Sequence, residues 1–110
     1  MGKRYGLPDD AVAFVRQRDR RCVYCHKVMS QPNRTARRQD WATIEHLNHL
    51  PPWNDPTTIA ICCFSCNSSR GKKPLLEWFA SAYCRRHDIS ESTVALPVRL
   101  YLRRHRHRRA

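Results

Sequence analysis

Two stretches of the chain carry hydrophobic residues at the spacing of an amphipathic helix. The first follows Pro8 and two aspartates that can cap a helix, and it predicts a helix over about residues 9–19. The second opens at Pro74 and predicts a helix over about residues 74–87. Its expected buried stripe consists of Leu75, Leu76, Trp78, Phe79, Ala82 and Tyr83.

Between these helices, two segments rich in β-forming residues predict strands over residues 41–47 and 57–62. Three prolines punctuate the segment that joins them, residues 48–58, and predict a loop. The second strand leads into a short predicted helix over about residues 65–70. Gly71 follows at a position that suits the end of a helix.

The C-terminal third has a weaker pattern. Residues 88–102 are ambiguous, although Ser92 and Pro97 suit the start of a further helix. Residues 103–110 form a basic tail of arginine and histidine that need not fold. The chain has 110 residues and shows no internal repeat, so we expect a single domain over residues 1–102, followed by the tail.

Charge and composition narrow the class of protein. There are 21 Lys and Arg against 9 Asp and Glu, and the formal net charge of +12 predicts a polyanionic partner, nucleic acid or an anionic membrane surface. A hydrophobic content of 41% excludes a wholly disordered basic protein. No apolar run approaches the roughly 18 residues of a membrane span, and no apolar signal region opens the chain. We therefore expect a cytoplasmic protein with reduced thiols.

Four cysteines form two Cys-x-x-Cys pairs, Cys22 with Cys25 and Cys63 with Cys66. A two-residue spacer lets both sulfurs of a turn converge on one ion, and two such turns complete a tetrahedral Zn²⁺ site. A chain of this size buries a limited core, so a structural zinc also supplies the cross-link that it needs. Cys62 is the alternative to Cys63, but it breaks the symmetry of the two pairs.

Other interpretations of the cysteines leave more unexplained. Cys22, Cys25 and His26 match a covalent haem attachment pattern. That interpretation needs an export signal and gives the second pair no purpose. A redox dithiol needs only one pair and a βαβ context that is absent here. Cys84 falls on the predicted helix 74–87 and is most simply a small apolar residue.

The residues around the second pair carry a more specific pattern. Ile44-Glu45-His46-Leu47 ends the first predicted strand, and Cys63-Phe-Ser-Cys-Asn67-Ser-Ser-Arg70-Gly-Lys72 follows the second. Over residues 22–73 the chain resembles the HNH endonuclease family. The resemblance implies an α+β fold, a small zinc-stabilised ββα-metal core with flanking helices. It also implies a bacterial or phage enzyme that hydrolyses phosphodiester bonds of DNA.

The same resemblance implies roles for single residues. His46 would be the general base that takes a proton from the attacking water. Glu45 and Asn67 would hold one catalytic divalent ion, and their oxygen atoms suit Mg²⁺ or Mn²⁺. Thr58 occupies the position whose backbone or side chain orients the histidine, where the family commonly has Asn. Asn54 is an alternative occupant.

Three basic clusters predict contacts with the DNA backbone. Arg70, Lys72 and Lys73 follow the proposed metal ligand, and Arg37 and Arg38 lie in the polar segment before the first strand. Such phosphate contacts make binding salt-dependent. The basic tail either grips DNA or contributes solubility, and no base-reading pattern is evident.

Two further functions stay open at this stage. A non-catalytic zinc-knuckle module that binds DNA or RNA needs only the cysteines and the basic surface. A basic scaffold or packaging accessory would bind nucleic acid without a divalent metal. His49 is either a loop histidine or an assistant to His46. The sequence leaves the oligomeric state undecided.

Overall fold

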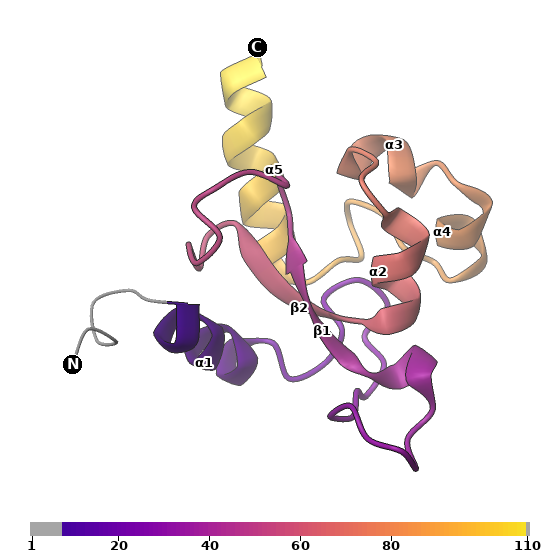
Figure 1. The fold of residues 1–110 in the computed structure, drawn as a ribbon. Helices are drawn as coiled ribbons and strands as arrows, with labels where there is room; N and C mark the ends of the chain where they lie inside the picture. The colour runs from indigo at the N-terminus through magenta and orange to yellow at the C-terminus, as the bar shows by residue number, and fades with distance from the viewer. Residues whose placement is uncertain (1–7, 110) are drawn as a thin grey trace.

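An antiparallel hairpin of two strands forms the middle of the fold in the computed structural model, which describes residues 8–109 (Figure 1). Strand β1, Ala42–His46, pairs with β2, Ile59–Cys63, so that Ala42 lies opposite Cys63 and His46 opposite Ile59. Both predicted strands are confirmed, and the proline-containing loop connects them. The register places the end of β1 beside the start of β2.

Helix α2, Phe64–Arg70, begins directly after β2. Its N-cap is Cys63, whose sulfur accepts a hydrogen bond from the backbone N–H of Cys66. Gly71 ends the helix with a φ of 55°, a left-handed conformation that glycine adopts without steric cost. The two strands and α2 together form a ββα unit, and the α+β fold class is confirmed.

The alternation of side chains along the strands gives the hairpin two different faces. Helix α1, Pro8–Arg18, lies on one side of the hairpin in Figure 1. A small hydrophobic cluster fills that side, and its buried members are Ala11, Val15, Ile59 and Ile61. The prediction of a helix near residues 9–19 is thus confirmed, and its apolar stripe packs against the sheet.

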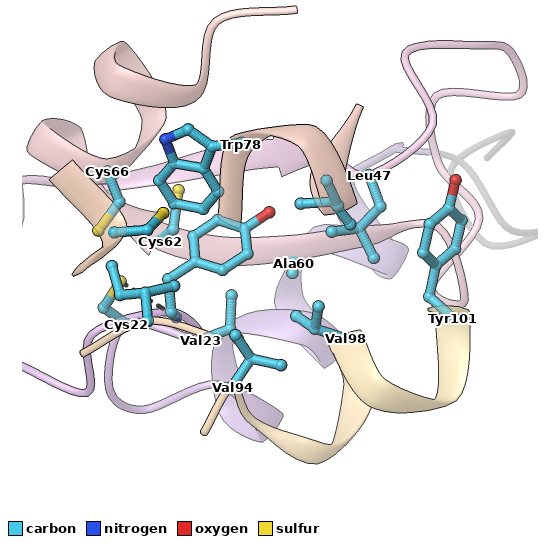
Figure 2. Close-up of a cluster of buried hydrophobic side chains, with 14 of the residues drawn as sticks. Cys22, Val23, Leu47, Ala60, Cys62, Cys66, Trp78, Val94, Val98 and Tyr101 are labelled. Atoms are coloured by element: carbon cyan, nitrogen blue, oxygen red, sulfur yellow. Dashed lines mark hydrogen bonds between the residues drawn. The ribbon is translucent and has the colours of Figure 1, made fainter. Parts of the chain in front are cut away.

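A larger core fills the other side of the hairpin (Figure 2). Helices α2, α3 (Leu75–Phe79), α4 (Ala82–Arg86) and α5 (Leu96–Arg109) surround it. Trp78 is fully buried at its centre, and its ring meets that of Tyr24 edge to face with centroids 4.8 Å apart. Val94 and Val98 close this core from the C-terminal part of the chain.

One expectation about the helices was wrong. The helix expected over residues 74–87 is two short helices, because the Ser81 side chain caps α4 by accepting from the N–H of Cys84 and ends the earlier run. The basic segment from residue 103 onward, for which the sequence predicted no structure, continues α5 as far as Arg109. Pro97 suits the first turn of that helix, and Val98, Tyr101 and Leu102 bury its apolar side.

The hydrophobic helices of this fold are short. Among residues 8–109, no helix combines the length and the hydrophobicity needed to cross a bilayer.

The polar segment before β1 includes one turn of 3₁₀-helix, Arg38–Asp40, and Ser30 forms an isolated β-bridge with Trp41.

Candidate metal centre and the polar network beside it

Four cysteine sulfurs converge at one point where three elements meet. Cys22 and Cys25 come from the turn after α1, Cys63 ends β2, and Cys66 lies in the first turn of α2. Their sulfur atoms all lie within 4.8 Å of one another, and those of Cys25 and Cys63 are 3.9 Å apart. Zn–S bonds of about 2.3 Å in a tetrahedron place sulfurs about 3.8 Å apart, so the four residues fit such a metal.

Backbone N–H groups point at the first sulfur of each pair. Those of Tyr24 and Cys25 donate to the sulfur of Cys22 over 3.4 and 3.5 Å, and that of Cys66 donates to Cys63 over 3.4 Å. Such donors stabilise the negative thiolate that binds a metal. The hydroxyl of Tyr83 adds a contact of 3.3 Å to the sulfur of Cys66.

The four thiols also compete for protons. Contact with Cys22 is the largest cause that lowers the pKa of the Cys25 thiol. Contact with Cys22 is likewise the largest cause that raises the pKa of Cys66. Four unpaired thiolates at this spacing would repel one another strongly. A divalent cation at the centre of the cluster compensates that charge, and the cluster can hold a structural metal such as zinc.

The remaining two cysteines lie outside the cluster, as the sequence indicates. Cys62 points away from it, 3.7 Å from the hydroxyl oxygen of Thr43, and burial is the main cause that raises the pKa of its thiol. Cys84 is buried in α4, and burial raises its pKa as well. Both therefore behave as small apolar core residues.

Glu45 lies inside the fold. Its side chain is 2% exposed, and its Oε2 accepts hydrogen bonds from the hydroxyl of Tyr24 over 2.6 Å and from Nη1 of Arg70 over 3.0 Å. A carboxylate in this position balances the buried guanidinium. In this structure Glu45 is therefore an internal partner of Arg70 rather than an open ligand for a catalytic ion.

Arg70 connects the end of α2 to the end of β1. Besides the ion pair, its guanidinium donates to the carbonyls of Lys73 over 2.8 Å, of Leu47 over 2.9 Å and of His46 over 3.3 Å. Its side chain is 2% exposed. The sequence interpretation placed Arg70 on the DNA backbone, and burial corrects this, because a guanidinium tied to four internal acceptors presents no surface to a phosphate.

Asn67 and Glu45 come to the same side of β1, where each has its own partners. The amide nitrogen of Asn67 donates to the hydroxyl of Thr43 over 2.9 Å and to the carbonyl of Ile44 over 3.3 Å. Asn67 thus ties the first turn of α2 to the start of β1, whereas Glu45 ties the end of β1 to the end of α2. The carboxylate of Glu45 thus faces Tyr24 and Arg70, and the amide nitrogen of Asn67 faces β1.

His46 ends β1 and is half-buried. Its ring meets the ring of Trp53 edge to face, with centroids 5.0 Å apart. Trp53 is 53% exposed, so this pair of rings lies at the protein surface. The backbone carbonyl of Thr58 accepts from the N–H of Leu47 over 2.8 Å, which closes the hairpin loop directly after His46.

The other basic residues that the sequence singled out are exposed. They are Arg37, Arg38, Lys72 and Lys73. The guanidinium of Arg38 stacks over the ring of Phe64 at 4.8 Å from its centroid, which leaves its charge at the surface beside the metal centre. Lys72 and Lys73 follow α2 on the exposed turn before α3.

Sequence reasoning missed two polar residues of this region, Asp19 and Tyr24, and left the role of a third, His49, open. Asp19 is buried, binds the Arg18 guanidinium through both carboxylate oxygens, and accepts from the N–H of Ile61 over 3.0 Å. Tyr24 is the second partner of Glu45, and its place inside the first Cys-x-x-Cys turn is the signal that could have found it. His49 has a buried Nε2 that lacks a hydrogen-bond partner among the described residues. Burial, followed by the charge of Arg70, lowers the pKa of His49.

Comparison of the chain with protein-family models, with curated proteins and with solved structures finds no significant match.

Proposed function

We propose that this chain is a zinc-stabilised DNA endonuclease of the HNH type, with His46 as its general base. The observation that carries the proposal is the ββα unit itself, with four convergent cysteines at one end and a surface histidine at the other. The cysteines fasten β2 and α2 to the turn after α1. The pairing of β1 with β2 places His46 opposite Ile59, at the other end of the hairpin from Cys63.

The place of His46 at the protein surface supports this role. Its ring is half-buried and contacts the exposed ring of Trp53, and an imidazole is a common general base in enzymes. The exposed positive residues Lys72, Lys73, Arg37 and Arg38 attract the DNA backbone, as does the net charge of +12. Binding is therefore expected to weaken steeply as salt is raised.

The divalent ion that the resemblance implies does not fit the present arrangement, because Glu45 is already paired with Arg70. The same observation favours a second candidate function, the non-catalytic zinc module that binds nucleic acid. In that function the buried ion pair is purely structural, and the exposed lysines and arginines do all the binding.

A plasmid assay separates the two functions. Supercoiled plasmid is incubated with zinc-loaded protein in buffer with Mg²⁺, with Mn²⁺, or with neither. Chelators are avoided because they also remove structural zinc. We expect nicked or linear plasmid when one of the two ions is present. Plasmid that is retarded on a gel but stays supercoiled under all conditions would assign the chain to the binding module.

A further inference from the structure

A cavity of about 480 Å³ lies between the loop after β1, the turn between α2 and α3, and the C-terminal helix α5. Its volume is in the range of small-ligand sites. We infer that this cavity holds one unpaired nucleotide of a DNA strand. The inference rests on the proposed function only in its choice of DNA as the strand, and its test needs no cleavage.

The floor of the cavity suits a nucleobase. It is formed by Leu47, Leu75, Tyr101 and Leu102, all of which are no more than 9% exposed. Figure 2 shows Leu47 and Tyr101 at the same end of the buried cluster, with Tyr101 carried by α5. Tyr101 is the aromatic member of this floor, and a base that stacks on an aromatic side chain gains about 1–3 kcal/mol.

The mouth of the cavity suits a phosphate. The exposed Lys72 lines it together with His49, and no aspartate or glutamate is among the lining residues of the described chain. Glu45 lies behind Arg70 and is already paired with it. A cavity with an apolar floor and an exposed lysine at its mouth matches the two parts of a nucleotide, a base and a negatively charged phosphate.

His49 gives a second and independent indication of a ligand. Its Nε2 is buried without a hydrogen-bond partner in the described structure, and such a group costs about 1–3 kcal/mol until it finds one. Its backbone has a φ of 55°, a conformation that non-glycine residues rarely adopt. An oxygen or nitrogen on the edge of a base satisfies Nε2. An unpaired base has its Watson–Crick edge free for this contact.

The cavity also adjoins the proposed base. The N–H of His49 donates to the carbonyl of His46 over 3.3 Å, so one turn of backbone connects the two. A nucleotide in the cavity places the neighbouring part of its strand beside His46. The cavity would then select DNA with unpaired nucleotides at the point of attack.

The test uses the zinc-loaded His46→Ala protein, which keeps the DNA intact during the measurement. Fluorescence anisotropy compares a labelled single-stranded oligonucleotide with a blunt duplex of the same sequence at one salt concentration. We expect the single strand to bind about tenfold more tightly, the lower part of the effect of one stacked base. Equal affinity for the two probes would overturn the inference.

Matched variants locate the binding. Leu76, 43% exposed, lines the cavity, whereas Leu100, 38% exposed, does not. Leu76→Glu should weaken binding of the single strand about tenfold, and Leu100→Glu, with the same change of charge, should weaken it less than about threefold. A second pair, Lys72→Gln and Lys73→Gln, makes the same comparison without altering apolar surface. Lys72 lines the cavity and Lys73 does not, so Lys72→Gln should weaken binding of the single strand more. Equal losses within both pairs would mean that binding is spread over the basic surface.

A small probe reports on His49 directly. Titration with deoxyadenosine monophosphate should shift the imidazole NMR resonances of His49 while those of the exposed His87 stay in place. Shifts that are equal at both histidines would contradict the site. The plasmid assay is independent of these results. If the plasmid stays uncut but His49 shifts selectively, the nuclease function is refuted and the nucleotide site in the cavity is supported. If the plasmid is cut but His49 does not shift, the nuclease function is supported and the nucleotide site is refuted.

Discussion

Replacing Glu45 with glutamine keeps the size of the side chain and removes the negative charge that faces Arg70. The charged atoms of the pair are 3.0 Å apart, and both side chains are 2% exposed. Water therefore has little access to the guanidinium when its partner loses its charge. Removing one member of a buried ion pair costs about 3–5 kcal/mol of stability.

The structure places this change at the lower end of that range. Glutamine keeps one oxygen that can accept from Tyr24 or Arg70, and the carbonyls of Leu47 and Lys73 still accept from the guanidinium. We therefore expect Glu45→Gln to lower the free energy of unfolding by about 3 kcal/mol. The exposed Glu77 of α3 gives the matched control, and Glu77→Gln should change stability by less than about 0.5 kcal/mol.

The measurement is urea unfolding at a fixed excess of free Zn²⁺, because bound metal contributes to the apparent stability. Calorimetric titration with Mn²⁺ accompanies it. If Glu45→Gln unfolds like the wild type but loses affinity for Mn²⁺, then Glu45 is a metal ligand, and the internal role derived from its burial is refuted. A large loss of stability with unchanged Mn²⁺ binding supports the internal role.

Three further predictions follow from the metal centre and the backbone. Cys66→Ser should lose bound zinc and cooperative unfolding, because structural zinc supplies roughly 10–16 kcal/mol of apparent binding energy. The control variant Cys62→Ala should keep its zinc. Equal zinc content of the two variants by mass spectrometry would contradict the assignment of Cys66 as a ligand. Acidification should release zinc, since protons compete with the metal for thiolates. A zinc-sensitive dye measures the released metal. Zinc that stays bound down to pH ~4 would count against thiolate ligands. Asp88 has a φ of 56°, so Asp88→Gly should stabilise the fold by roughly 1 kcal/mol, and an unchanged or lower melting temperature would disprove that strain.

Local patterns predicted much of this fold. The strands and α2 follow from runs of β-forming residues and from Gly71, and the cysteine spacing predicts a cluster because each pair lies within one turn. The break at Ser81 was missed because the apolar stripe continues across it, while a single side-chain cap decides where the helix ends. The length of α5 depends on packing of Val98 and Leu102, which the arginine-rich sequence conceals.

The roles of polar residues were harder to predict. Glu45 and Arg70 fit the pattern of a metal ligand and a phosphate contact, and only the packed structure shows that they meet inside the core. The alternation of strand side chains was the available signal, because it places Glu45 on the same side of β1 as the buried Leu47. His49 gave no pattern in the sequence, since its burial arises from segments that are distant along the chain.

The most direct test of the proposed function is the rate of plasmid nicking by wild type and by His46→Ala at equal zinc content, in Mg²⁺ or Mn²⁺. His46 lies at the end of β1, away from the four cysteines, so its replacement should leave zinc content unchanged. Removing a general base should slow nicking by about 10²–10⁴-fold while DNA binding persists. Equal nicking rates for the two proteins would contradict the proposal that His46 is the base.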